Sequence, residues 1–247
     1  MQSTANERVT TALGISGYGN DEHERLLRAL AEQLKLPLLQ IARGAELAQG
    51  TNDTSSYASI TYTADMALRL IDSYLLSVEL QAQPSLELEP VSVSATLQDT
   101  AHALSQLARQ YDTELQINLK GKYQPVMAHR SSLESALMSL GYGFIESTAE
   151  GERKHTVVLG AHQSTKGLVV GAYGNQPAMS SEALKRGIAL FGSAKQALPQ
   201  LSGSAGAGVF IANSLLRSIN APLHVSKHNS LSGLAATLSP SRQLSLV

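Results

Sequence analysis

Residues 30–40 read Leu-Ala-Glu-Gln-Leu-Lys-Leu-Pro-Leu-Leu-Gln, a stretch with a helical pattern that contains Pro37. A proline inside a helix removes a backbone donor and clashes with the preceding turn, which costs about 3 kcal/mol. The apolar residues around it nevertheless keep the spacing of three and four that marks one face of a helix, as Leu30, Leu34 and Ile41 show. We therefore predict a helix that retains an internal proline.

The same apolar spacing extends in both directions and then repeats in a second segment. A cap at Asn20 or Asp21 predicts a first helix that starts near Glu22, and a cap at Asp53 or Thr54 predicts a second helix. The apolar seams are Leu27, Leu30, Leu34, Pro37, Ile41 and Ala48 in the first helix, and Tyr57, Ile60, Ala64, Ala67, Ile71, Tyr74 and Val78 in the second. Two long helices joined by a short turn form a hairpin.

Because these seams are broader than one hairpin can cover, we expect two copies to pair as a four-helix bundle. Packing of the hairpin against the rest of the chain is the alternative.

Downstream of the hairpin, short strands and helices alternate irregularly, which predicts a mixed sheet with helices on one face. The expected class is α+β with two domains: an α/β sandwich follows the helical hairpin. The expected segments are a mobile tail (1–21), a hairpin dimerisation domain (22–82), a linker (83–92) and the sandwich (93–247). Predicted helices are 94–110, 131–147, 180–191 and 209–219; predicted strands are 114–119, 155–161, 168–173, 223–226 and 234–238, and 194–208 is expected to be flexible.

Composition excludes several function classes. The chain has 19 basic and 20 acidic residues, three Phe and no Trp, so neither charge nor aromatic content favours binding to nucleic acid. It has no Cys, no apolar run of the ~20 residues that span a membrane, and an N-terminus without the apolar core of a signal peptide. The seven His residues show no metal-ligand spacing, and we interpret His155 and His162 as facing solvent. We expect a cytoplasmic protein with no metal and no direct membrane insertion.

The order of these features resembles the core of sensor histidine kinases. Glu32–Leu38 aligns without a gap on the His-Glu-x-x-Thr-Pro-type motif of that family, and Pro37 matches its proline. Leu133–Thr148 resembles the N-box helix, 169–174 the first glycine box, Phe191 the F-box, and 206–212 the second glycine box with its helix. The resemblance covers roughly residues 22–240. It implies a helical dimerisation hairpin followed by an ATP-binding domain of the GHKL (Bergerat) type.

The residues that would carry phosphotransfer chemistry in that family are replaced here. The phosphoacceptor position is occupied by Glu32, which has no imidazole to form a phosphoramidate. His23 lies nine residues earlier and so faces the opposite side of the helix. The positions that orient a water for phosphatase activity are Gln33 and Leu36. The resemblance therefore implies no catalytic residue in the hairpin.

The nucleotide-binding positions implied by the resemblance are also changed. The Mg²⁺-binding Asn corresponds to Gly143, the other N-box Asn to Ser139, and the usual Lys to Glu146, whose charge would repel a triphosphate. The adenine-reading Asp corresponds to Ala172. Gly174 of the first box is kept, although the second glycine of that box is Gln176.

Gly206 and Gly208 also remain, before a helix N-terminus that could hold an anion, although we favour a packing role for them.

The apolar core positions of the family are kept, whereas its catalytic and nucleotide-binding residues are replaced. This pattern predicts a pseudokinase that acts by binding in a two-component pathway. The expected partners are a second copy of the chain and a response regulator or a true histidine kinase, with no cofactor. The expected docking surface is Glu32, Lys35, Leu36, Leu38, Leu39 and Ala42. One alternative is a divergent kinase or phosphotransfer protein that binds Mg-ATP through other residues; a second is a small-ligand sensor that uses the emptied nucleotide cleft.

Overall fold

The computed structural model describes residues 4–51, 54–82, 86–119, 121–147, 155–193, 197–201 and 204–241, without the side chains of 4–20, 50, 51, 54 and 55. Two long helices, α1 (Thr4–Thr51) and α2 (Thr54–Ala82), form the predicted hairpin. α1 begins at Thr4, well before the predicted start near Glu22, and continues through Pro37. The predicted cap Asp53 lies outside the described residues.

The second part is a mixed sheet with helices on one face, as predicted. Its strand order is β2-β4-β5-β7-β6, in which β2 and β4 run parallel and the other neighbours antiparallel. The strands are β2 (Thr113–Leu119), β4 (His155–Ser164), β5 (Gly167–Gly174), β6 (His224–His228) and β7 (Leu231–Leu238). A separate pair, β1 (Glu89–Val91) and β3 (Val126–Ala128), places part of the predicted linker in a small antiparallel ladder.

The helices of this part begin at side-chain caps that their sequences provide. α3 (Val93–Gln110) and α5 (Ser181–Leu190) are capped by Ser92 and Ser180, whose hydroxyls accept bonds from the backbone N–H groups of Ala95 and Ala183. α4 (Arg130–Glu146) is capped by the ring of His129. α6 (Ala205–Ser218) differs, because the side chain of Ser204 makes no capping bond to its backbone.

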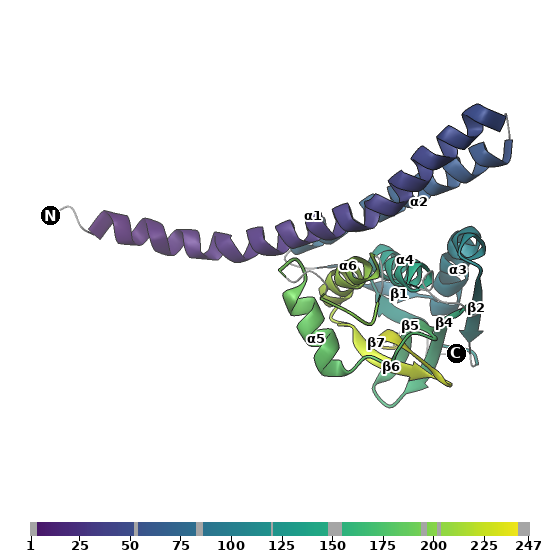
Figure 1. Ribbon diagram of the computed structural model, residues 1–247. Helices are drawn as coiled ribbons and strands as arrows, with labels where there is room; N and C mark the ends of the chain where they lie inside the picture. Colours follow the sequence, from purple (N-terminus) through teal and green to yellow (C-terminus); the bar gives the residue numbers. More distant parts are fainter. Residues whose placement is uncertain are drawn as a thin grey trace.

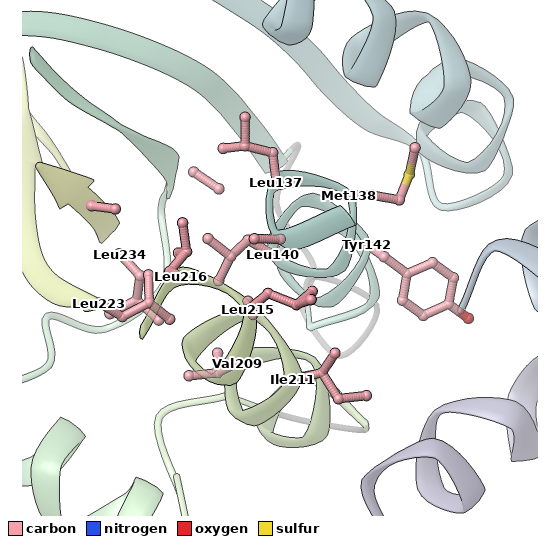
Figure 2. Close-up of a cluster of buried hydrophobic side chains, with 14 of the residues drawn as sticks. Leu137, Met138, Leu140, Tyr142, Val209, Ile211, Leu215, Leu216, Leu223 and Leu234 are labelled. Carbon is pink, nitrogen blue, oxygen red and sulfur yellow. The ribbon is translucent and has the colours of Figure 1, made fainter. Parts of the chain in front are cut away.

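The core lies between the sheet and the helix pair α4 and α6. Figure 2 shows Leu140 of α4 close to Leu215 and Leu216 of α6, while Leu137 and Tyr142 point away from α6 in two other directions. All five of these side chains are almost completely buried. This packing fixes α4 and α6 side by side on the sheet.

The hairpin forms a third layer over these helices (Figure 1). The hydroxyl of Tyr62 donates to Ala103 O and accepts from Leu107 N, both at 2.9 Å, and so joins α2 to α3. Arg25 donates to three carbonyls at the end of α5, including Ile188 O at 2.5 Å. The alternative of packing against the rest of the chain therefore holds for one face of the hairpin.

Apolar side chains remain on the outer face of the same hairpin. On α2, Leu68 and Leu75 are 57% and 55% exposed, and Ile71 between them is half-buried. On α1, Leu38 is 57% exposed, while Leu34 is half-buried. Of the predicted seam residues, Leu27 and Tyr57 are 51% and 55% exposed, whereas Leu30, Pro37 and Ala48 are buried within the single chain.

Candidate functional site

Glu32, at the position of the missing phosphoacceptor, lies half-buried on α1. Its carboxylate is 3.6 Å from the guanidinium of Arg28, one turn earlier on the same helix. The Arg28 side chain is 57% exposed and the Glu32 side chain 37%, and ion pairs this accessible to water contribute little to stability. Glu32 is therefore available at the surface and is not held by the fold.

The predicted docking residues are not all equally accessible. Lys35, Leu38, Leu39 and Ala42 are exposed on α1, with Leu39 at 49%. Leu36 differs from the expectation of an exposed position, because it is half-buried.

Gln33 is completely buried where α1 meets α6 and α4. A Cβ added to Gly208 would lie 2.8 Å from Gln33 Nε2 and 2.8 Å from Ser139 O, so the three helices meet closely here. Neither polar atom of the Gln33 amide has a hydrogen-bond partner among the described residues. A side chain enclosed in this way does not present its amide to solvent.

The N-box positions on α4 lie against α6. Ser139 is buried, and its hydroxyl has no partner among the described residues. A Cβ at Gly143 would lie 3.1 Å from Ala205 Cα, so the helix backbones meet with no room for a side chain. The position where the family resemblance implies a Mg²⁺ ligand is thus a helix–helix contact.

Glu146 holds the beginning of α6. Its buried carboxylate accepts a bond from Ser204 N at 3.0 Å and a second, short bond from the Ser204 hydroxyl. Burial raises the pKa of Glu146 above its usual value, and the two bonds from Ser204 oppose that rise. The sequence predicted a charge directed at incoming phosphate; instead, the carboxylate serves as an internal anion at the helix N-terminus.

On the sheet side, the side chain of Gln176 closes the site. Its amide Nε2 donates to Phe144 O and to Ser147 Oγ, each at 3.1 Å. A Cβ at Gly174 would lie 2.1 Å from Gln176 Oε1, and Ala172 is completely buried in β5. The amide therefore ties the end of β5 to the end of α4.

A cavity of about 20 Å³ lies beside the Gln176 side chain. It is lined by residues from α4, from the segments on either side of α5 and from β7: Phe144, Gln176, Pro177, Met179, Leu201, Ser232, Gly233 and Leu234. A cavity of this size holds roughly one water molecule.

The two retained glycines lie in the first turn of α6, not before it as predicted. Gly208 is required by the close approach of Gln33 and Ser139, whereas the nearest side-chain atom to a Cβ at Gly206 is Leu198 Cβ at 3.9 Å. The predicted flexible stretch 194–208 includes residues 194–196 and 202–203, which lie outside the described residues.

Sequence reasoning missed Ser204 and Gln176 as the residues that close the site. Gln176 was noted only as a lost glycine, and the identity of Ser204 carries no signal without its contact to Glu146. The interpretation of His162 as facing solvent is wrong. Its ring packs against that of buried His228, with the two Nδ1 atoms 3.3 Å apart. No three His, Asp or Glu side chains in the described ranges are grouped as metal ligands.

Solved structures of other proteins have a fold similar to that of this chain. The chain resembles the Acinetobacter baumannii histidine kinase AdeS with a TM-score of 0.51 and 13% identity, over 85% of this chain and 98% of that one. It resembles the catalytic domain of the histidine kinase ThkA with a TM-score of 0.50 and 13% identity, over 63% of this chain and 97% of that domain.

The chain has the fold of a histidine kinase core.

ThkA in complex with the response regulator protein TrrA is also similar, with a TM-score of 0.52 and 11% identity, over 96% of this chain and 64% of that one. No protein-family model and no curated protein sequence matches the chain. No described helix is both long enough and apolar enough to cross a membrane. The histidine-kinase fold is therefore carried by a sequence that is only 11–13% identical to these structures.

Proposed function

We propose that this chain is a pseudokinase of the histidine-kinase type, which acts by binding proteins in a cytoplasmic two-component pathway and does not phosphorylate itself. The position that aligns with the phosphoacceptor holds Glu32, whose carboxylate cannot form a phosphoramidate. No imidazole lies nearby to replace it, because His23 is more than two turns away along α1.

The observation that carries the proposal is the closed cleft. Pockets for nucleotide-sized ligands occupy about 300–1,000 Å³, whereas the cavity beside Phe144 and Gln176 has about 20 Å³. Opening it would require breaking the bonds of Gln176 to α4 and of Glu146 to Ser204. The same closure argues against a sensor that uses this cleft for another small ligand.

The chain also lacks groups that would hold Mg-ATP if the cleft opened. Gly143 offers no oxygen ligand to Mg²⁺, and Ala172 offers no acceptor to an adenine amine. The Glu146 carboxylate already occupies the N-terminus of α6, which otherwise could bind phosphate. The proposal therefore includes no nucleotide cofactor.

Two surfaces on the hairpin are left for partners. The first is the apolar stripe of Leu68, Ile71 and Leu75 on α2, whose spacing suits the seam of a four-helix bundle made by two copies. The second is the exposed stripe of Lys35, Leu39 and Ala42 on α1, proposed to dock a response regulator or a true histidine kinase. The similarity to ThkA in its complex with the response regulator protein TrrA supports a response regulator as this partner.

Calorimetric titration of the purified chain with Mg-ATP and with Mg-ADP tests the proposal. We expect no heat of binding at protein concentrations that detect sub-millimolar affinity, while a histidine kinase that binds Mg-ATP serves as the positive control. Binding tighter than about 100 µM, which is about 5.5 kcal/mol, would overturn it. A parallel incubation with radiolabelled ATP should leave the chain unlabelled, and label on any residue would favour the divergent-kinase alternative.

A further inference from the structure

A groove of about 440 Å³ lies where α1 meets α5 and α6, at the opposite end of α6 from Gly206 and Gly208. Its apolar lining comes from three parts of the chain: Leu184 and Ile188 of α5, Phe210 of α6, and Leu223 beyond α6. Phe210 is itself held by stacking on Phe191, with ring centroids 4.7 Å apart. The floor of the groove is thus apolar and fixed.

The polar rim of the groove is mainly basic. Arg25, Lys185 and Arg217 line it, and Glu22 is the single acidic residue. The guanidinium of Arg25 is held by the carbonyl groups at the end of α5 and lies 4.9 Å from the centre of the Phe210 ring. Lys185 and Arg217 are exposed, and neither forms an ion pair with a described residue.

Asn213 adds a neutral polar group to the same groove. It is only 6% exposed and lines the groove from α6. Ser214 beside it is already bonded, because its hydroxyl accepts from Ser77 Oγ at 2.9 Å. The Asn213 side chain can therefore donate a hydrogen bond to a ligand in the groove.

We propose that this groove binds a small organic anion that has an apolar body and a carboxylate or phosphate group. The apolar body would lie against Phe210 and Leu223, the anionic group would meet Lys185 and Arg217, and the Asn213 amide would donate to it. The volume is in the range of small-ligand sites and the charge of the rim complements an anion. The site is separate from the closed nucleotide cleft, so it does not depend on the proposed function.

Arg25 and Glu22 of α1 also line the groove, so a ligand bound to α5 and α6 would lie beside the hairpin. Ligand binding to the folded chain raises its stability in proportion to the logarithm of ligand concentration. The proposed ligand would therefore raise the thermal stability of the chain.

Fluorescence titration with 8-anilinonaphthalene-1-sulfonate, an apolar anion, tests the site. We expect saturable binding that is at least tenfold weaker in the double variant Lys185→Glu/Arg217→Glu and unchanged in the matched control Lys122→Glu/Lys166→Glu, whose exposed residues lie outside the groove. Hexanoate should displace the probe and hexan-1-ol should not. Equal binding by both double variants, displacement by the alcohol alone or the absence of saturable binding would overturn the proposal.

Discussion

Replacement of Gln33 by methionine should stabilise the protein, although Gln33 is one of its most completely buried side chains. Both polar atoms of its amide lack hydrogen-bond partners, in a contact formed with Gly208 and Ser139. An unpaired buried donor or acceptor costs about 1–3 kcal/mol, and methionine has nearly the same length without either atom. We therefore expect the free energy of unfolding to rise by about 2 kcal/mol or more.

Urea denaturation of Gln33→Met beside the unchanged chain measures this gain directly. In a chain of this size, about 2 kcal/mol corresponds to a rise in Tm of roughly 4–8 °C. The matched control is Gln40→Met on the same helix, because the Gln40 amide donates to the Tyr111 hydroxyl at 3.3 Å. We expect that variant to gain nothing. A loss of stability in Gln33→Met would show that the buried amide is paired, for example to an enclosed water, and would refute the reasoning.

Three further changes test the packing of the chain. Tyr62→Phe removes the hydroxyl that bonds to both Ala103 O and Leu107 N, so thermal unfolding should reveal a loss of about 1–3 kcal/mol. Burial raises the pKa of Glu146, so the folded state binds the proton of this carboxyl group more tightly than the unfolded state does. The stability that this group contributes is therefore lost as pH rises from about 4.3 through the raised pKa. We expect the urea midpoint to fall less steeply with pH in Glu146→Gln than in the unchanged chain. Leu68→Glu/Leu75→Glu should convert the proposed dimer to a monomer in light scattering, and a wild-type chain that is already monomeric would contradict the bundle.

The helical hairpin was predictable because its signal is local and repeated. Apolar residues at spacings of three and four persist over both helices, and no single substitution decides the outcome. The start of α1 was not predictable, because Asn20 and Asp21 are good capping residues but the helix passes through them. A capping residue permits a helix to begin and does not force one to end there.

Errors in the second part have two physical causes. The first turn of α6 was assigned to a loop because of Gly206 and Gly208, since glycine disfavours helices by about 1 kcal/mol; close packing against α4 outweighs that propensity here. The pairing of β1 with β3 joins two three-residue segments that lie far apart in the sequence. The alternation of residues 86–93 indicates an extended segment around β1, but it carries no information about the partner strand.

The candidate site shows the same division between local and non-local information. The substitutions at Glu32, Gly143 and Ala172 are visible in the sequence, because each can be compared with a motif at a known spacing. The closure of the cleft is not visible, because it depends on the side chains of Glu146 and Gln176 reaching other elements.

The contacts of α6 with α4 and with α1 are formed by different kinds of side chain. This difference predicts which of the two contacts opens more easily. Against α4, glycine and alanine bring the backbones together, and the Glu146 carboxylate is bonded, so this contact loses little by staying closed. Against α1, Gln33 is enclosed without partners, so separation would restore water to its amide. If one contact opens when a partner docks on the hairpin, we expect it to be the one at Gln33, while the contact of α6 with α4 and the closed cleft persist. Faster amide hydrogen exchange in α1 than in α4 would agree with this order, and faster exchange in α4 would contradict it.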